Sequence, residues 1–239
     1  MRLVNDRHAV KARLLKPTGD GFLLLAAQVG TWRGPLPSAV SPLAAKAREQ
    51  ARRLEALEVD VFQAVLRPPG EGDGLLAARG ISPARYDLVV LARTDSPQTA
   101  LRLRESRAYL ELAATVRAAS RRTHETVAAN AARLGDVDHG EDHAFLFNYF
   151  YADDPETLLK VWEYTAGWFQ AKTALPNSAL MRPLAGEPAE YGIINHASWP
   201  SLRTFLPSLL LRPTFRSFVL ANFKANGVAA QPIIYRRVR

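Results

Sequence analysis

The sequence contains no cysteine. Disulfides, thiolate metal sites and thiol catalysis are therefore excluded, and the composition fits a reducing compartment. No run approaches the ~20 apolar residues of a membrane span, and the first residues lack the apolar core of a signal peptide. We therefore expect a cytoplasmic protein with no membrane partner.

Several motifs that carry chemistry are also missing. The sequence has no glycine-rich phosphate loop and no G-x-S-x-G nucleophile elbow. Its histidines do not show metal-ligand spacing on any one element. His139 lies in an acidic segment, residues 135–142, and His143 directly follows it. These groups could bind a cation, but the segment is typical of a solvated linker. We predict no metal site.

Charge of one sign is not concentrated anywhere. The net charge of +8 divides into +6 over residues 1–140 and +2 over residues 141–239, and the excess is arginine spread along predicted helix faces. No aromatic residues alternate with these arginines, as a stacking platform for nucleic acid would require. Nucleic acid is therefore not expected as a partner.

The second half of the chain has the clearest pattern of strands and helices. Asp154 and Pro155 provide the capping residue and first-turn proline of a helix. Another helix is expected over residues 201–225, broken at Pro207 and at residues 212–213 because proline removes a backbone donor. The predicted order is strand 144–151, helix 155–172, strand 178–182, strand 191–199, helix 201–225 and strand 232–238.

The first half repeats this order more weakly. Strands are predicted over residues 22–29, 59–66 and 86–92, with helices over residues 41–57 and 97–120. Residues 122–134 are ambiguous, because their alanines favour a helix whereas the repeated order requires a strand. The linker at residues 135–142 predicts two domains, residues 1–138 and residues 139–239.

Both halves therefore predict one fold class, α+β. Each half is expected to form a ferredoxin-like unit with the order β-α-β-β-α-β and both helices on one face of the sheet. A single unit would leave its other sheet face exposed to water. Two fused units can bury these faces against each other as a barrel-like core.

One stretch carries a family resemblance. Residues 191–205 (YGIINHASWPSLRTF) and 212–218 (RPTFRSF) join an aromatic-ended strand to a helix and a short aromatic segment. This stretch resembles the antibiotic biosynthesis monooxygenase-like branch of the dimeric α+β barrel superfamily. The resemblance implies an intrachain dimeric α+β barrel. It also implies that Asn195 and Trp199, four apart on one strand face, hold a phenolic substrate without a cofactor.

Other candidate site residues follow from their positions. His196 faces away from Asn195 and could act as a base or as an axial haem ligand, or simply lie at an interface. Asn148 is expected on a neighbouring strand, where it could converge with Asn195. The aromatic residues of the second half could line a substrate pocket or pack as core: Trp162, Trp168, Phe169 and Tyr191.

The leading hypothesis is a cofactor-independent monooxygenase, or a cyclase using His196, that acts on a small aromatic molecule of polyketide-type secondary metabolism. Two alternatives stay open. One is a non-catalytic ligand-binding or assembly protein of the same fold, and the other is a haem protein similar to chlorite dismutase-like enzymes. The sequence leaves the substrate undecided, and it also leaves open whether the chain forms a homo-oligomer.

Overall fold

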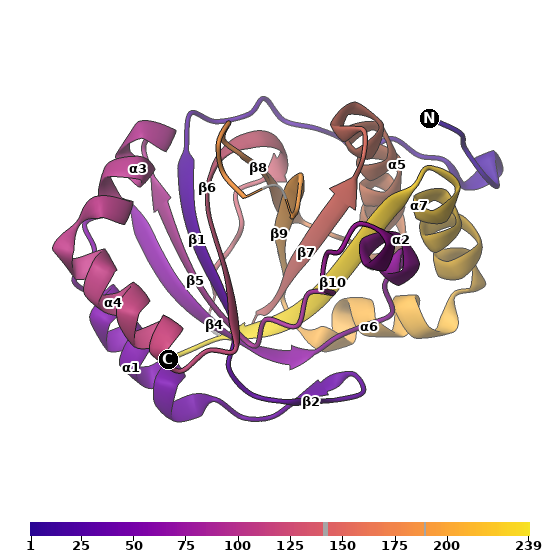
Figure 1. Cartoon of the computed structure of the whole chain (residues 1–239). Coiled ribbons are helices and arrows are strands. Elements are labelled where there is room, and N and C mark those ends of the chain that lie inside the picture. Colours follow the sequence, from indigo (N-terminus) through magenta and orange to yellow (C-terminus); the bar gives the residue numbers. More distant parts are fainter. Residues whose placement is uncertain (141–142, 189) are drawn as a thin grey trace.

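The chain forms one closed barrel of eight antiparallel strands with its helices outside (Figure 1). The computed structural model describes residues 1–140, 143–188 and 190–239. Around the barrel the strands follow the order β1-β5-β4-β10-β7-β9-β8-β6.

Each half of the chain supplies four neighbouring strands. The first four are β1 (Gly21–Gln28), β4 (Glu58–Leu66), β5 (Leu88–Thr94) and β6 (Arg122–Gly135). The second four are β7 (Ala144–Ala152), β8 (Asn177–Pro183), β9 (Ile193–Trp199) and β10 (Val228–Arg237). In each set the fourth strand lies beside the first, and the third lies between the first and the second. This is the ferredoxin-like order, so the predicted fold class is confirmed.

The two sets join at two seams, where β10 pairs with β4 and β6 pairs with β8. These seams turn two open sheets into one barrel, so each strand is covered on both faces. The proposed domain boundary at residues 138 and 139 stays a prediction, because both sets contribute to the same barrel.

Helices from each half cover the outside of their own strands (Figure 1). The first half has α1 (Ser41–Ala51), α3 (Pro97–Glu105) and α4 (Arg107–Ala118); the second has α5 (Pro155–Thr173), α6 (Leu202–Leu211), the π-helix η2 (Phe215–Leu220) and α7 (Ala221–Ala225). The shorter elements are η1 (Asp6–His8), β2 (Trp32–Arg33), β3 (Leu36–Pro37) and α2 (Asp73–Ala78).

Local sequence signals account for several helix starts. Ser96 and Ser106 accept hydrogen bonds from the third following backbone N–H and so begin α3 and α4. Asp154 accepts from the backbone N–H of Glu156 and begins α5 ahead of Pro155, as predicted. The last predicted helix does break after α6, but Pro207 lies inside α6 and does not break it.

The ambiguous residues 122–134 belong to strand β6. This strand pairs with β1 along one edge and with β8 along the other. Most of its inward-facing residues are buried, and the small side chains of Ala128 and Ala132 fit into the packed core. Tertiary pairing therefore overrides the helix propensity of the alanines.

The core has three layers. One lies between the first four strands and helices α1, α3 and α4, and a second lies between the last four strands and helices α5 to α7. The third fills the barrel interior and is rich in aromatic rings, among them Phe62, Tyr86, Phe145, Phe147, Tyr149 and Tyr235. The second and third layers hold the polar groups described below.

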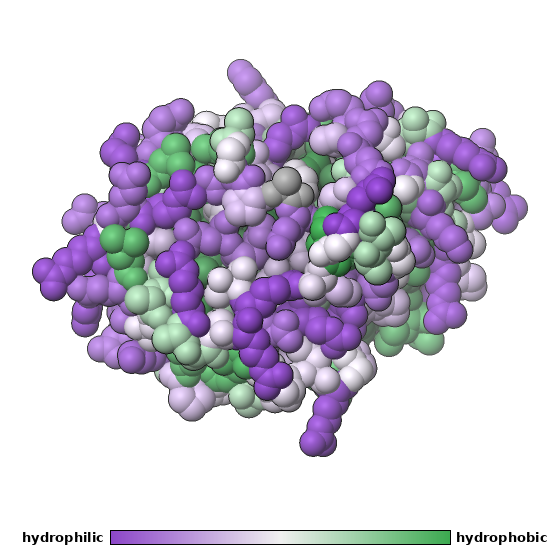
Figure 2. All heavy atoms as spheres, viewed as in Figure 1, coloured by the Kyte–Doolittle hydropathy of each residue, from purple (hydrophilic) through white to green (hydrophobic). Residues whose placement is uncertain are grey.

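Within the described residues, no helix has both the length and the apolar character that crossing a membrane requires. The face drawn in Figure 2 is mostly hydrophilic, with apolar side chains in small separate patches. Leu210 and Leu211, near the end of α6, are among the most exposed large apolar residues at 59% and 79%.

The N-terminal segment crosses α5 at Gly167. A Cβ atom at Gly167 would lie 1.8 Å from the carbonyl oxygen of Val10, so only glycine permits this approach. The same segment is held by a hydrogen bond from the backbone N–H of Ala12 to the carbonyl of Glu163. Residues 10–12 are thereby fastened to the helical layer of the second half.

We expect Gly167→Ala to lower the Tm by roughly 2–10 °C, because an overpacked contact costs about 1–3 kcal/mol. Calorimetry measures this, and limited proteolysis should show faster cleavage near residue 10. The control is Gly74→Ala in α2, where an added Cβ meets nothing within 4 Å. A Gly167→Ala protein as stable and as protease-resistant as the control would contradict the tight contact.

Candidate functional site

Two asparagines on the helix-facing side of the C-terminal sheet form the centre of the first candidate site. Asn148 on β7 and Asn195 on β9 lie directly opposite each other in the strand register. Their neighbours on this face are apolar, including Leu146, Ala197 and Trp199. The predicted convergence of the two amides is therefore present.

The hydrogen bonds of these two amides are incomplete. Asn195 Oδ1 accepts from Ser178 Oγ at 2.5 Å, but its Nδ2 group has no partner among the described residues. Asn148 Oδ1 is buried and likewise has no partner in the described part of the chain. Buried polar atoms are nearly always paired, so the unpaired Asn148 Oδ1 is an open acceptor. The Nδ2 group of Asn195 makes no hydrogen bond within the described residues and is available as a donor.

The open amides face two small adjoining cavities of about 30 Å³ each. One cavity extends toward α5 and β8, and the other extends toward α6, η2 and Pro68–Gly70. Five residues line both cavities: Leu146, Asn148, Phe169, Trp199 and Phe223. We call these two neighbouring cavities the crevice, of which Asn195 lines only the one toward α5 and β8. Each cavity holds about one water molecule, far less than the roughly 300–1,000 Å³ of a ligand pocket.

Trp199 forms one wall of the crevice. Its Nε1 donates to Thr173 Oγ1 at 3.2 Å, and its ring stacks on Phe205 with centroids 4.3 Å apart. Trp162 and Phe169 also line the crevice. Trp168 packs behind it, where its Nε1 donates to Thr214 Oγ1 at 3.2 Å.

Tyr191 does not line the crevice. Alternation along the predicted strand 191–199 would place it on the face of Asn195, and this expectation is wrong. Strand β9 begins only at Ile193, so the two-residue alternation does not extend back through Gly192. The Tyr191 ring lies in the barrel interior, 5.0 Å from the ring of His124 and 5.2 Å from that of Tyr149.

His196 faces the barrel interior, as the alternation with Asn195 predicts. Its ring stacks on Phe147 at 4.2 Å, and its Nδ1 donates to the carbonyl of Leu146 at 3.2 Å. Burial and the neighbouring His139 hold the pKa of His196 well below its usual value. His196 is therefore neutral, and the C-terminal sheet separates it from Asn195 and Trp199. The three predicted catalytic residues do not share one site.

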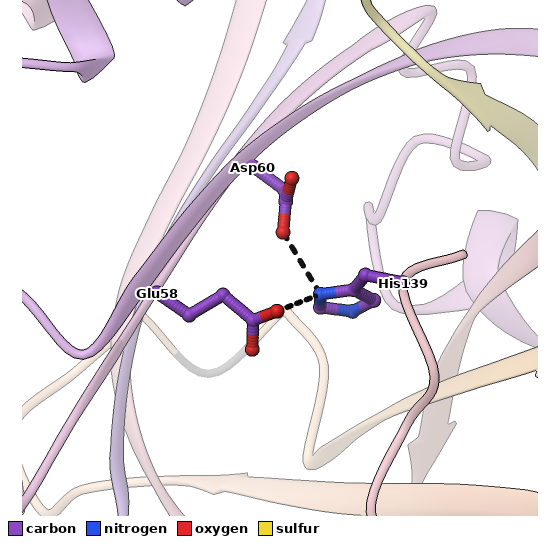
Figure 3. Close-up of side chains that lie close together, drawn as sticks. All are labelled: Glu58, Asp60 and His139. Atoms are coloured by element: carbon purple, nitrogen blue, oxygen red, sulfur yellow. Dashed lines mark hydrogen bonds and ion pairs between the residues drawn. The ribbon is translucent and has the colours of Figure 1, made fainter. Parts of the chain in front are cut away.

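The second candidate site lies at one mouth of the barrel, where the linker places His139 (Figure 3). Its Nδ1 lies 2.6 Å from Glu58 Oε1 and 2.8 Å from Asp60 Oδ2. Its Nε2 lies 2.9 Å from Nε2 of His196. Because Nδ1 of His196 carries a proton, its Nε2 is an acceptor, so Nε2 of His139 must donate.

The two carboxylates set the charge of His139. Burial lowers the pKa of His139, but hydrogen bonds to Asp60 and Glu58 outweigh burial and raise that pKa to about 9. Burial raises the pKa of both carboxyl groups, yet their contacts with His139 leave each pKa below its usual value. His139 is thus an imidazolium that donates from both ring nitrogens.

Sequence reasoning missed this cluster. It grouped His139 with acidic neighbours in the linker, of which residues 141–142 lie outside the described residues, whereas the structure pairs His139 with Glu58 and Asp60 of β4. The available signal was two carboxylates two residues apart, on one face of a strand otherwise rich in apolar residues. Carboxylate and imidazole atoms of these three residues lie within 4.8 Å of one another and could hold a metal ion.

Comparison with known proteins reveals shared architecture. No protein-family model matches the chain, and no curated protein matches its sequence. Among solved structures, an anthrone oxidase-like protein aligns with a TM-score of 0.62 at 11% identity, over 96% of this chain and 94% of its own.

Two further structures align over most of their length. A candidate monooxygenase from Fusobacterium nucleatum has a TM-score of 0.57 at 5% identity, over 93% of this chain and 94% of its own. A mutant chlorite dismutase from Candidatus Nitrospira defluvii has a TM-score of 0.50 at 10% identity, over 94% and 92%. The chain has the dimeric α+β barrel fold.

A haem protein is one of the alternatives left open by the sequence, and haem would need an iron ligand beside its pocket. Haem iron takes an axial ligand from His, Cys, Met or Tyr. Among the described residues, none of these types lines the crevice. His196 lies on the other side of the sheet with both ring nitrogens engaged. The crevice of this dimeric α+β barrel does not fit haem.

The ion pairs of His139 should make stability depend on alkaline pH. A group whose pKa is raised on folding stabilises fully below its unfolded value, near 6.5, and loses that effect as the pH rises through about 9. In buffer with a chelator, the stability difference between the wild type and His139→Ala should therefore shrink by roughly 1–3 kcal/mol between pH 6 and pH 10.

Urea unfolding at several pH values measures this difference. Glu58 and Asp60 stay ionised throughout that range, so their titration does not contribute to the change in the stability difference. His143→Ala, just after the linker, serves as the control, because His143 does not contact Glu58 or Asp60. The charged state of His139 would be refuted if the free energy of unfolding of the wild type exceeded that of His139→Ala by the same amount at pH 6 and at pH 10.

Proposed function

We propose that this protein is a cofactor-independent oxygenase that oxidises a small phenolic or anthrone-type aromatic compound in the crevice. The observation that carries the proposal is the pair of opposed amides, Asn148 and Asn195, with an open acceptor and an open donor amid apolar walls. Apolar walls with a few convergent polar groups are typical of small-molecule sites. Aromatic polyketide or related secondary metabolism is the setting that such a substrate suggests.

The two amides suit an ionised hydroxyl or carbonyl oxygen. The Nδ2 group of Asn195 would donate to the oxygen of a phenolate or enolate, and Asn148 Oδ1 would accept from a neighbouring hydroxyl. A fixed donor in a site that excludes water stabilises such a charge strongly. The indole of Trp199 would form a flat wall beside the aromatic rings.

The reaction needs no external reductant. A CH₂ carbon activated by the enolate loses two C–H bonds and gains a C=O bond, while the O–O bond of O₂ is broken. One oxygen atom enters the carbonyl, and the other leaves as water with the two hydrogens. The four electrons that O₂ takes up come from the substrate carbon. No titratable side chain lines the crevice among the described residues, so the substrate enters as its anion.

A substrate larger than water can enter only if a wall of the crevice moves, and α6 is one such wall. Pro207 removes one backbone hydrogen bond from this helix, and Ser201 provides no side-chain cap at its start. The next turn is a π-helix, a strained form often found at functional sites. Phe205 and Leu209 of α6 close the crevice, whereas Leu210 and Leu211 face solvent. α6 is therefore suited to act as a lid.

Anthrone is a suitable probe, and its product under air would be anthraquinone. We expect the wild type to form anthraquinone faster than the buffer reaction, as followed by absorbance and oxygen uptake. Asn195→Ala should lower kcat/KM about 100-fold, the usual cost of losing one fixed hydrogen bond to a developing oxyanion. Asn148→Ala should have a smaller effect, because anthrone has no hydroxyl from which Asn148 Oδ1 could accept. Gln50→Ala, on α1 of the first half, should leave the rate unchanged.

Two results would count against the oxygenase. One is a wild-type rate equal to the buffer rate with no change in tryptophan fluorescence on adding anthrone. The other is saturable quenching of that fluorescence without turnover, which would instead favour a non-catalytic ligand-binding protein. Equal rates for Asn195→Ala and the wild type would remove the role assigned to the amides.

A further inference from the structure

We infer that Glu58, Asp60 and His139 form a binding site for a divalent transition-metal ion at the mouth of the barrel. The three ligands come from strand β4 and from the linker between the two halves of the chain. The site is separate from the crevice, since these residues belong to the barrel side of the sheets. This inference does not depend on the proposed oxygenase activity.

The contacts of His139 leave one of the two carboxylates without a well-aligned hydrogen bond. A single N–H on Nδ1 of His139 faces two anionic oxygens, Glu58 Oε1 at 2.6 Å and Asp60 Oδ2 at 2.8 Å. One proton cannot point straight at both acceptors. A divalent cation in place of that proton could bind the imidazole nitrogen and both oxygens together (Figure 3).

Each ligand also has the supporting partner that metal sites require. Arg93 Nε lies 3.3 Å from the far oxygen of Glu58, and Arg237 Nη1 lies 3.2 Å from the far oxygen of Asp60. The other nitrogen of His139, Nε2, donates to His196. These contacts orient the ligands and leave Nδ1 and the two near oxygens directed at one point. Groups that hydrogen-bond to metal ligands have this orienting effect in known metal sites.

A neighbouring cavity gives independent support for the site. A cavity of about 60 Å³ is lined by Glu58, His139 and His196, together with polar side chains such as Asn130 and Asp20. This is enough space for a few water molecules. A metal ion held by three protein ligands would complete its coordination shell with water from this side, and the polar walls would hold that water.

The donor set selects the kind of metal. One imidazole and two carboxylates suit Zn²⁺, Mn²⁺, Co²⁺ or Fe²⁺, whereas Ca²⁺ and Mg²⁺ prefer oxygen ligands only. A bound ion would fasten the linker to β4 and close this mouth of the barrel. It would also present water to the small polar cavity.

The test is metal binding by the full chain after dialysis against a chelator. After Zn²⁺ is added back and the excess is removed, we expect about one Zn²⁺ per chain by elemental analysis, and a visible absorption band when Co²⁺ is added instead. Glu58→Gln and Asp60→Asn keep the side-chain shape and should weaken binding at least ~10-fold, while His139→Ala should abolish it. His143→Ala should bind like the wild type.

Circular dichroism checks that each variant is folded, and the isosteric Glu58→Gln keeps the test valid if His139→Ala unfolds. No stoichiometric Zn²⁺ or Co²⁺ binding by the folded wild type would overturn the inference. Equal affinity in the wild type and Glu58→Gln would do the same. The anthrone assay is independent of these results, because the crevice contains none of the three ligands.

Discussion

Closure of the barrel is the constraint on which the rest of the structure depends. Pairing of β10 with β4 and of β6 with β8 joins the two four-stranded sets and buries the face that each set would otherwise expose. Strands covered on both faces have no water to satisfy polar side chains, so every polar group on them needs an internal partner. Asn148, at the first candidate site, is one of the groups that lack such a partner.

Strand β9 shows how closure divides the chemistry between two compartments. Asn195 faces the helical layer, where it and Asn148 leave an open donor and an open acceptor. The next residue, His196, faces the barrel interior and accepts from the imidazolium of His139. One side of the sheet thus offers a neutral amide pair in apolar surroundings, and the other holds a charged network anchored by Glu58 and Asp60.

Much of this could be predicted from the sequence, because element order and alternation are local properties. The ferredoxin-like order, the opposite orientation of Asn195 and His196, and the meeting of Asn148 with Asn195 all follow from them. The prediction from alternation was wrong for Tyr191, because strand β9 begins only at Ile193. Alternation could not show the pairing of His139 with β4, since some eighty residues separate these partners and only barrel closure brings them together. Nor could it show the size of the crevice, which side-chain packing decides.

The central claim is that the crevice opens at α6 to hold an aromatic oxyanion against the two amides. A crystal structure of the full chain soaked with anthrone in the absence of oxygen tests it most directly. The account predicts α6 displaced outward and the anthrone oxygen within hydrogen-bond distance of the Asn195 Nδ2 group and beside Asn148. Anthrone bound inside the barrel, or a crevice that stays closed and empty at saturating anthrone, would contradict it.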